Sequence, residues 1–202
     1  MVAYYVATKG EHAFGTEENR LKNLLNGNPV GLKKIDDAQL KDLLSWMLQH
    51  EPKLRRSANE ALRHPYLRSN EESFDMLCDV GNQPEIKQPK CQNSDVRKQL
   101  NRRTKWMKRI HDEVLKDLKT FEVNNKNRTV TYKSSWASCL RFIRNVDQHW
   151  HDKPRLRLSP FIKEDNYKEY FIQRFPELPL VVHKIIRSTD WKTRPKLQKH
   201  FT

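Results

Sequence analysis

The pattern of apolar and polar residues predicts helices along most of the chain. Residues 36–50 are a clear case, because their apolar side chains recur every three or four positions on one face. Asp36 and Asp37 precede that face, where acidic residues favour a helix N-terminus, and Pro52 ends it. The apolar positions of this face are Leu40, Leu43, Leu44, Met47 and Leu48.

Two shorter helices are predicted on either side of this one. Residues 1–15 are expected to be the end of a buried helix that stops at Gly10 and continues into a loop. Ser57 and Glu60 have the spacing of a capping box, so a second helix is expected from Ser57 to Leu67.

Residues 96–121 predict the longest helix in the chain. Its apolar stripe consists of Leu100, Met107, Ile110, Val114, Leu118 and Phe121, and its polar face carries Arg102, Arg103, Lys105, Lys108, Arg109, Lys116 and Lys119. Further helices are expected at 136–145, with Trp136, Cys139, Leu140 and Ile143 inward, and at 166–175 and 177–188. Loops are expected at 79–95, 123–135 and 146–160.

The composition supports a mainly helical fold. Hydrophobic residues make up 36% and charged residues 32% of the sequence, which is polar for a globular protein. Five Trp, eight Phe and six Tyr can still form cores. The chain has only five Gly and few alternating apolar runs, so helices are favoured over strands.

The charge is unevenly distributed. Basic and acidic residues balance in residues 1–90, so the whole net charge of +14 falls in residues 91–202. A basic unit favours polyanionic partners, because it releases the counterions condensed on them. A solvated basic surface is the alternative interpretation of the same charge.

The cysteines indicate a reducing compartment. Cys78, Cys91 and Cys139 form an odd set without a CxxC pair, which argues against a disulfide framework or a structural zinc site. The sequence contains neither a membrane-length apolar run nor the basic start of a signal peptide. A cytoplasmic location is therefore expected.

Residues 4–67 carry two stretches that resemble the C-terminal lobe of protein kinases. YYVATKGEHAFG is similar to the pattern YYV-x-x-x-G-x-H-P-F-G, and LLSWMLQHEPKLRRSANEALRHPYL to L-x-x-M-L-x-x-x-P-x-x-R-x-[ST]-A-x-x-x-L-x-H-P. Arg55 stands at the kinase arginine that pairs with a glutamate missing here. The glycine-rich loop, the strand lysine and the HRD and DFG motifs are also missing, so phosphoryl transfer is not expected. The resemblance implies a partial kinase C-lobe over residues 1–69 that acts as a scaffold.

Three further segments follow: FDMLCDVGNQPEI, TYKSSWASCLRFIRNVDQH and YFIQRFPEL. They resemble the kinase-extension nuclease (KEN) family, which includes ribonuclease L and the inositol-requiring kinase/ribonuclease of the unfolded-protein response. The R-N-x-x-x-H pattern is the most specific part, and LRFIRN is closer to ribonuclease L. The resemblance implies a mainly α chain, in which a partial kinase C-lobe packs on an all-helical ribonuclease domain over residues 70–202.

Four residues match the functional positions of that family: Tyr132, Arg144, Asn145 and His149. Metal-independent RNA cleavage needs proton transfer at the 2′-hydroxyl and the 5′-oxygen, together with cations for the phosphate. His149 suits proton transfer near neutral pH, and Arg144 suits the phosphate. Asn145 can bind ribose or base, and Tyr132 can act on the 2′-hydroxyl proton. Their alternative interpretations are a surface histidine, a solvated charge, a helix cap and loop packing.

Three more residues are candidates for RNA contacts. Lys133 and Arg141 can bind phosphates, with solvated charge as the alternative, and Trp106 can border the site or pack in the core. A nearby acidic and imidazole cluster fits no regular zinc spacing, so neither a metal nor a cofactor is expected. That cluster consists of Asp147, His149, His151 and Asp152.

The leading hypothesis is therefore an endoribonuclease that cleaves single-stranded or looped RNA to 2′,3′-cyclic phosphate and 5′-hydroxyl ends. The resemblance implies that it acts as a homodimer or as a dimer with a longer relative. Two alternatives stay open. The chain could be a non-catalytic RNA-binding or dimerisation module, or a piece of a larger kinase/ribonuclease, which its start inside a helix favours.

Overall fold

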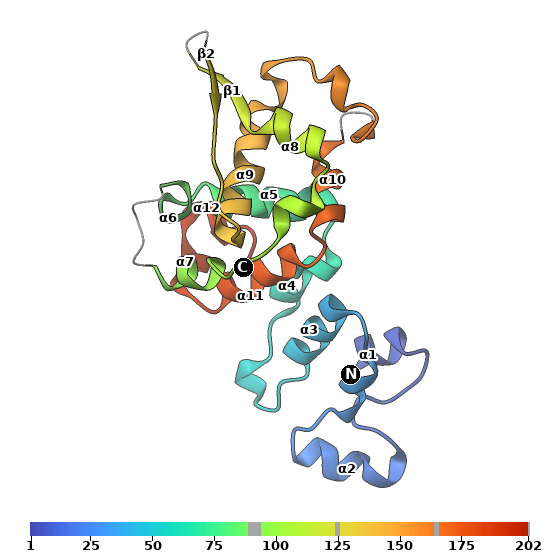
Figure 1. Ribbon diagram of the computed structural model, residues 1–202. Coiled ribbons are helices and arrows are strands. Elements are labelled where there is room, and N and C mark those ends of the chain that lie inside the picture. Colours follow the sequence, from blue (N-terminus) through green and yellow to red (C-terminus); the bar gives the residue numbers. More distant parts are fainter. Residues whose placement is uncertain (89–93, 124–125, 164–165, 202) are drawn as a thin grey trace. The chain divides into compact units, whose positions relative to one another are not determined.

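The computed structural model describes residues 1–88, 94–123, 126–163 and 166–201 (Figure 1). The chain forms two compact units, residues 1–67 and residues 68–201. Both are built mainly from helices, as the hydrophobic pattern predicts. Within the described residues, no helix has the length and apolar character that crossing a membrane requires.

The first unit consists of short helices around a small core. Its α-helices are α1 (Val2–Ala7), α2 (Glu17–Leu25), α3 (Ala38–Met47) and α4 (Ala58–Leu62), and 3₁₀ turns cover Val30–Lys34, Pro52–Leu54 and Pro65–Leu67. The core consists of Tyr4, Ala13, Phe14, Ile35, Leu44 and Leu48. α3 confirms the predicted helix, and its apolar stripe supplies part of this core.

The helix starts of this unit follow the predicted capping. The Asp37 side chain caps α3 by accepting hydrogen bonds from the backbone N–H groups of Gln39 and Leu40. Ser57 and Glu60 form the predicted capping box at the start of α4. The first helix differs from prediction, because Tyr4 is its only buried residue and Val2 and Val6 are exposed.

The second unit contains most of the helices and one hairpin. Its α-helices are α5 (Asn70–Gly81), α6 (Pro84–Lys87), α7 (Asp95–Leu100), α8 (Asp112–Leu118), α9 (Trp136–His149), α10 (Tyr167–Arg174), α11 (Leu178–Arg187) and α12 (Pro195–Gln198). The strands are β1 (Thr120–Val123) and β2 (Lys126–Thr129), and 3₁₀ turns cover Trp106–Arg109, Trp150–Asp152, Leu156–Leu158 and Asp190–Thr193. α5 packs against α9 and α10 at the centre of the unit (Figure 1).

The prediction of one long helix over residues 96–121 is wrong. α7 ends at Leu100, a 3₁₀ turn follows at Trp106–Arg109, and α8 begins after His111. The backbone between the helices turns away to pair with another segment, since Thr104 donates its N–H to the carbonyl of Ser134 at 2.9 Å. The predicted apolar stripe is nevertheless inward: Leu100, Ile110, Val114, Leu118 and Phe121 are buried.

The three predicted loops also differ from the structure. β1 and β2 pair as an antiparallel hairpin, with Thr120 opposite Thr129. β1 begins within the predicted helix at 96–121, and β2 lies in the expected loop at 123–135. α9 continues to His149 and a 3₁₀ turn follows it, so the expected loop at 146–160 is largely replaced by helical turns. α5 and α6 likewise occupy part of the expected loop at 79–95, of which residues 89–93 lie outside the described residues. The closing helices α10 and α11 confirm the prediction.

The cysteines described by the structure are free and buried. Cys78 lies on α5 and Cys139 on α9, and burial raises the pKa of each thiol. Cys91 lies outside the described residues.

Candidate functional site

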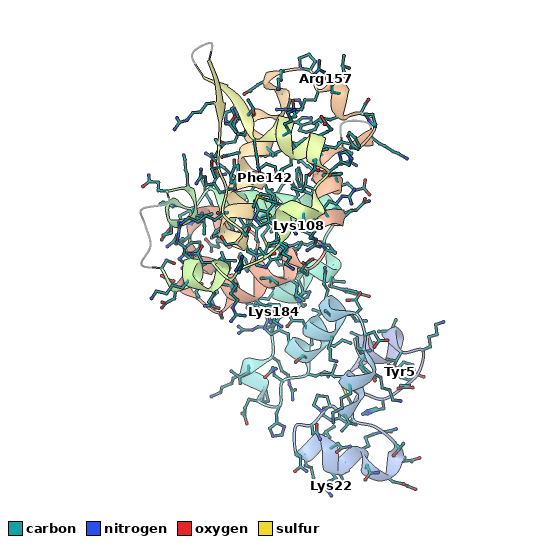
Figure 2. The ribbon with its side chains drawn as sticks, in the orientation of Figure 1. Tyr5, Lys22, Lys108, Phe142, Arg157 and Lys184 are labelled. Carbon is teal, nitrogen blue, oxygen red and sulfur yellow. The ribbon has the colours of Figure 1, made fainter. Side chains whose placement is uncertain are left out.

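α9 carries three of the four predicted catalytic residues. Ser135 caps it by accepting a hydrogen bond from the Ser138 N–H, and one face of the helix is buried along its length. Phe142, labelled in Figure 2, lies on that face among other aromatic rings. Its ring centroid is 5.1 Å from that of Trp106 and 5.8 Å from that of Phe171. The helix is therefore a fixed support for side chains on its other faces.

Tyr132 reaches α9 from the extended segment that precedes it. Its ring makes edge-to-face contacts with Trp106 and Phe142, at 6.1 and 5.2 Å between centroids. The Trp106 indole N–H donates to the carbonyl of Lys133 at 3.0 Å, which fixes the segment. Burial raises the pKa of the Tyr132 phenol, so the hydroxyl is neutral at pH 7.

A chain of hydrogen bonds links Tyr132 to Arg144. Asn145 donates from Nδ2 to the Tyr132 hydroxyl at 2.8 Å, and its Oδ1 accepts from Arg144 Nη1 at 2.7 Å. The two contacts fix the orientation of the Asn145 amide. Arg144 also donates from Nε to Oδ1 of Asn82 at 2.7 Å. Its guanidinium is therefore held by two neutral amides. Burial lowers its pKa, but a guanidinium still carries its positive charge at pH 7 and can offer it to a ligand.

Asn82 reaches Arg144 because α5 approaches α9 very closely at Gly81. A Cβ built on Gly81 would lie 2.6 Å from the carbonyl oxygen of Leu140 and 2.9 Å from Cβ of Arg144. Glycine is therefore required at this crossing. The sequence did not indicate Asn82 as a site residue, because its partner lies 62 positions away along the chain.

His149 is the last residue of α9, whereas the prediction placed it in the loop that follows the helix. Its Nδ1 lies 2.7 Å from Oδ2 of Asp152, and its side chain is 39% exposed. The ring lies 4.8 Å from that of Phe121, between centroids. Nε2 has no protein partner within the described ranges, so it is accessible for proton transfer.

Arg144, Asn145 and His149 line one cavity of about 330 Å³. The remaining lining residues are Lys87, Phe121, Arg128, Val130 and Arg141. Four of the eight lining side chains are Lys or Arg, and none carries a carboxylate, so the cavity suits an anion. Tyr132 does not line this cavity but lies next to a residue that does, since the Arg141 guanidinium is 5.3 Å from its ring centroid.

The three predicted RNA-contact residues have different environments. Lys133 is exposed and Arg141 is half-buried, and both line a second pocket beside the first. Trp106 is fully buried and its indole N–H is bonded to the protein backbone, so its place is in the core and it has no exposed face for a base.

The acidic and imidazole cluster does not converge on one point. Asp147 accepts a hydrogen bond from the Tyr167 hydroxyl at 3.0 Å, whereas Asp152 is bonded to His149. In the described part of the chain, no group of three or more His, Cys, Asp or Glu side chains is arranged to hold a metal ion.

Comparison with known proteins gives the family. The model of the Ribonuclease 2-5A family matches residues 73–201. The chain belongs to this family. The resemblance inferred from the R-N-x-x-x-H pattern and its flanking segments is thereby confirmed, and the matched range contains all the candidate site residues.

Relatives of this family align with nearly the whole chain. The serine/threonine-protein kinase/endoribonuclease ire-1 of Caenorhabditis elegans is 33% identical over 91% of this chain and 19% of its own length. The 2-5A-dependent ribonuclease of Mus musculus is 25% identical over 98% of this chain and 26% of its own length. The chain thus spans about a fifth to a quarter of these relatives.

Proposed function

We propose that this chain is a metal-independent endoribonuclease that cleaves single-stranded or looped RNA to 2′,3′-cyclic phosphate and 5′-hydroxyl ends. The observation that carries the proposal is that Arg144, Asn145 and His149 line one cationic cavity. The names of the family and of its relatives support RNA cleavage in general.

The cavity provides the chemical groups that this reaction requires. The guanidinium of Arg144 binds the scissile phosphate and offsets the charge that grows on its oxygens. The amide of Asn145 orients the ribose, and the neutral hydroxyl of Tyr132, which does not line the cavity, holds that amide through its hydrogen bond. The 2′-oxygen forms a bond to phosphorus while the bond to the 5′-oxygen breaks. One proton moves from the 2′-hydroxyl to the leaving oxygen through the imidazole of His149.

Asp152 supports the imidazole in this role. A carboxylate at Nδ1 favours the tautomer with the proton on that nitrogen, which leaves Nε2 free to exchange a proton with the substrate. Asp152 therefore orients His149 and stabilises its positive charge during transfer.

We further propose that residues 1–69 are part of a kinase-like C-lobe that serves as a scaffold and that the active species is a dimer. Relatives named as kinase/endoribonucleases align with 91% to 100% of the chain, which supports a kinase-like first unit. Such a scaffold would hold two ribonuclease domains side by side.

The test is RNA cleavage by the purified chain in the presence of a chelator. We expect His149→Ala to abolish cleavage of a labelled stem-loop RNA. His151→Ala, an exposed imidazole two positions away, should leave the rate unchanged. Mass spectrometry of the products should give the cyclic phosphate, and the rate per chain should rise with chain concentration if the dimer is active.

Three outcomes would contradict this proposal. Cleavage that survives His149→Ala would remove His149 from the mechanism, and activity lost with the chelator would exclude the metal-independent route. RNA binding without cleavage at any chain concentration would instead identify the chain as a non-catalytic RNA-binding module.

A further inference from the structure

A second pocket of about 650 Å³ adjoins the candidate site, and Arg141 lines both. Its other charged lining residues are Arg97, Arg103 and Lys133, and its lining contains no carboxylate and no aromatic ring. We propose that this second pocket binds a backbone phosphate of a nucleotide flanking the cleaved one in single-stranded RNA. This inference rests on the proposed function and specifies how the substrate strand is held.

The backbone that forms this pocket is held in place by hydrogen bonds to neighbouring segments. Residues 131–135 run between the segment 103–106 and the start of α9. Thr104 donates its N–H to the carbonyl of Ser134 at 2.9 Å, and Lys133 donates its N–H to the Ser138 hydroxyl at 3.3 Å. Its shape is therefore fixed before a ligand arrives, which lowers the entropic cost of binding.

Three of the four charged side chains in this pocket lack a carboxylate partner within the residues that the structure describes, and the fourth, Arg97, donates to the backbone carbonyls of Glu85 and Gln88. Among the described residues, Arg103, Lys133 and Arg141 have no carboxylate within ion-pair distance. Elsewhere in the same unit, cations pair with carboxylates: Lys168 with Glu71 at 2.9 Å, Arg194 with Glu85 at 2.7 Å, and Arg109 with Glu177. Cations without internal partners can neutralise a backbone phosphate and thereby release the counterions condensed on the RNA.

The rest of the lining favours phosphate and sugar over bases. The hydroxyls of Thr131, Ser134 and Ser138 can donate hydrogen bonds to phosphate oxygens. Sequence-tolerant binding of bases needs aromatic faces, and none lines this pocket. A strand that extends from the first cavity passes Arg141, so one continuous backbone can occupy both pockets.

The experiment compares two RNA substrates that share the same cleaved step, a dinucleotide and an oligonucleotide with several flanking residues. We expect Arg103→Ala to lower kcat/KM for the oligonucleotide relative to the dinucleotide by roughly fivefold at about 0.1 M salt, the contribution of one single-strand phosphate contact. Arg103→Lys should retain most of the preference. Lys105→Ala, an exposed cation that lines neither pocket, should leave the ratio unchanged.

Binding separates failure of this inference from failure of the proposed function. An uncleavable 2′-O-methyl oligonucleotide should bind Arg103→Ala roughly fivefold more weakly, with a salt slope smaller by about 0.7. This expectation holds even if the chain cleaves nothing. Equal affinity and equal salt slope for Arg103→Ala and Lys105→Ala, with both variants folded by circular dichroism, would overturn the proposed subsite.

Discussion

The carboxylate of Asp152 lies 2.7 Å from Nδ1 of His149. His149 is the last residue of α9, and Asp152 follows it by three positions. The contact joins the helix to the 3₁₀ turn that follows it. Because the pair is half-exposed, solvent weakens its electrostatic contribution, and the orientation of the imidazole matters at least as much as the charge.

We predict that Asp152→Asn lowers kcat for RNA cleavage by about fivefold, the effect of losing roughly 1 kcal/mol from an exposed pair. Asp152→Glu should retain most of the rate, because it keeps the carboxylate within reach of the ring. Asp112→Asn, which changes an exposed carboxylate away from the cavity, is the matched control. Rates of Asp152→Asn equal to those of the control would show that the contact does not assist His149.

Tyr132→Phe removes the hydroxyl that accepts the Asn145 hydrogen bond. We expect kcat to fall by about fivefold, because the Asn145 amide loses a hydrogen bond worth roughly 1 kcal/mol that fixes its orientation. Stability should fall by about 1 kcal/mol, because Asn145 Nδ2 is left buried without that partner. Steady-state kinetics and urea unfolding measure the two effects. A loss of stability without a loss of rate would assign Tyr132 to packing alone.

Tyr132 should also make the stability of the fold depend on pH in the alkaline range. Burial raises the folded-state pKa of Tyr132 above its ordinary value of 10.0, so the fold favours the protonated phenol. The resulting stabilisation is complete below pH 10.0 and is lost as the pH rises through the folded pKa. The stability difference between wild type and Tyr132→Phe should therefore shrink above pH 10. A stability difference that stays constant above pH 10 would show that burial does not raise the pKa of Tyr132.

Glu85 should make the stability of the fold depend on pH in the acid range, with stability lost as the pH falls. The Arg194 guanidinium donates to Oε1 of Glu85 at 2.7 Å and lowers the pKa of that carboxyl below its ordinary value of 4.5. The resulting stabilisation is complete above pH 4.5 and is lost as the pH falls through the folded pKa. Thermal unfolding of Glu85→Gln should depend less on pH in this range than that of wild type. Glu113→Gln, which changes an exposed carboxylate, should keep the wild-type slope.

The sequence predicted the parts of the candidate site that lie on one helix. Arg144, Asn145 and His149 fall within two turns of α9, so their proximity follows from local periodicity and needs no long-range contact. The capping of α3 and α4 was likewise local, since each cap bonds within three residues. The capping predictions depend only on neighbouring residues and are confirmed. The catalytic roles of the three α9 residues stay predictions.

The features that the sequence missed depend on distant partners. The helix expected at 96–121 is broken because Thr104 pairs with Ser134, thirty positions away, and a pattern of apolar residues carries no information about that pairing. Those apolar residues are buried in either arrangement, so the stripe gave the correct core from the wrong helix. Asn82 was missed for the same reason, because its role follows from the crossing of α5 and α9.

That crossing gives the last prediction. Gly81→Ala places a methyl group 2.6 Å from the carbonyl oxygen of Leu140, a backbone atom that cannot move aside alone. α5 must therefore shift away from α9, at a cost of roughly 1–3 kcal/mol, and carry Asn82 away from Arg144. Urea unfolding should show the destabilisation, and kcat should fall at temperatures where the variant is fully folded.

Asn82→Ala is the matched comparison, since it removes the Arg144 hydrogen bond without the clash. It should reduce kcat with a smaller loss of stability. If Gly81→Ala loses stability but Asn82→Ala keeps the full rate, the crossing serves packing alone and Asn82 does not hold Arg144 for catalysis.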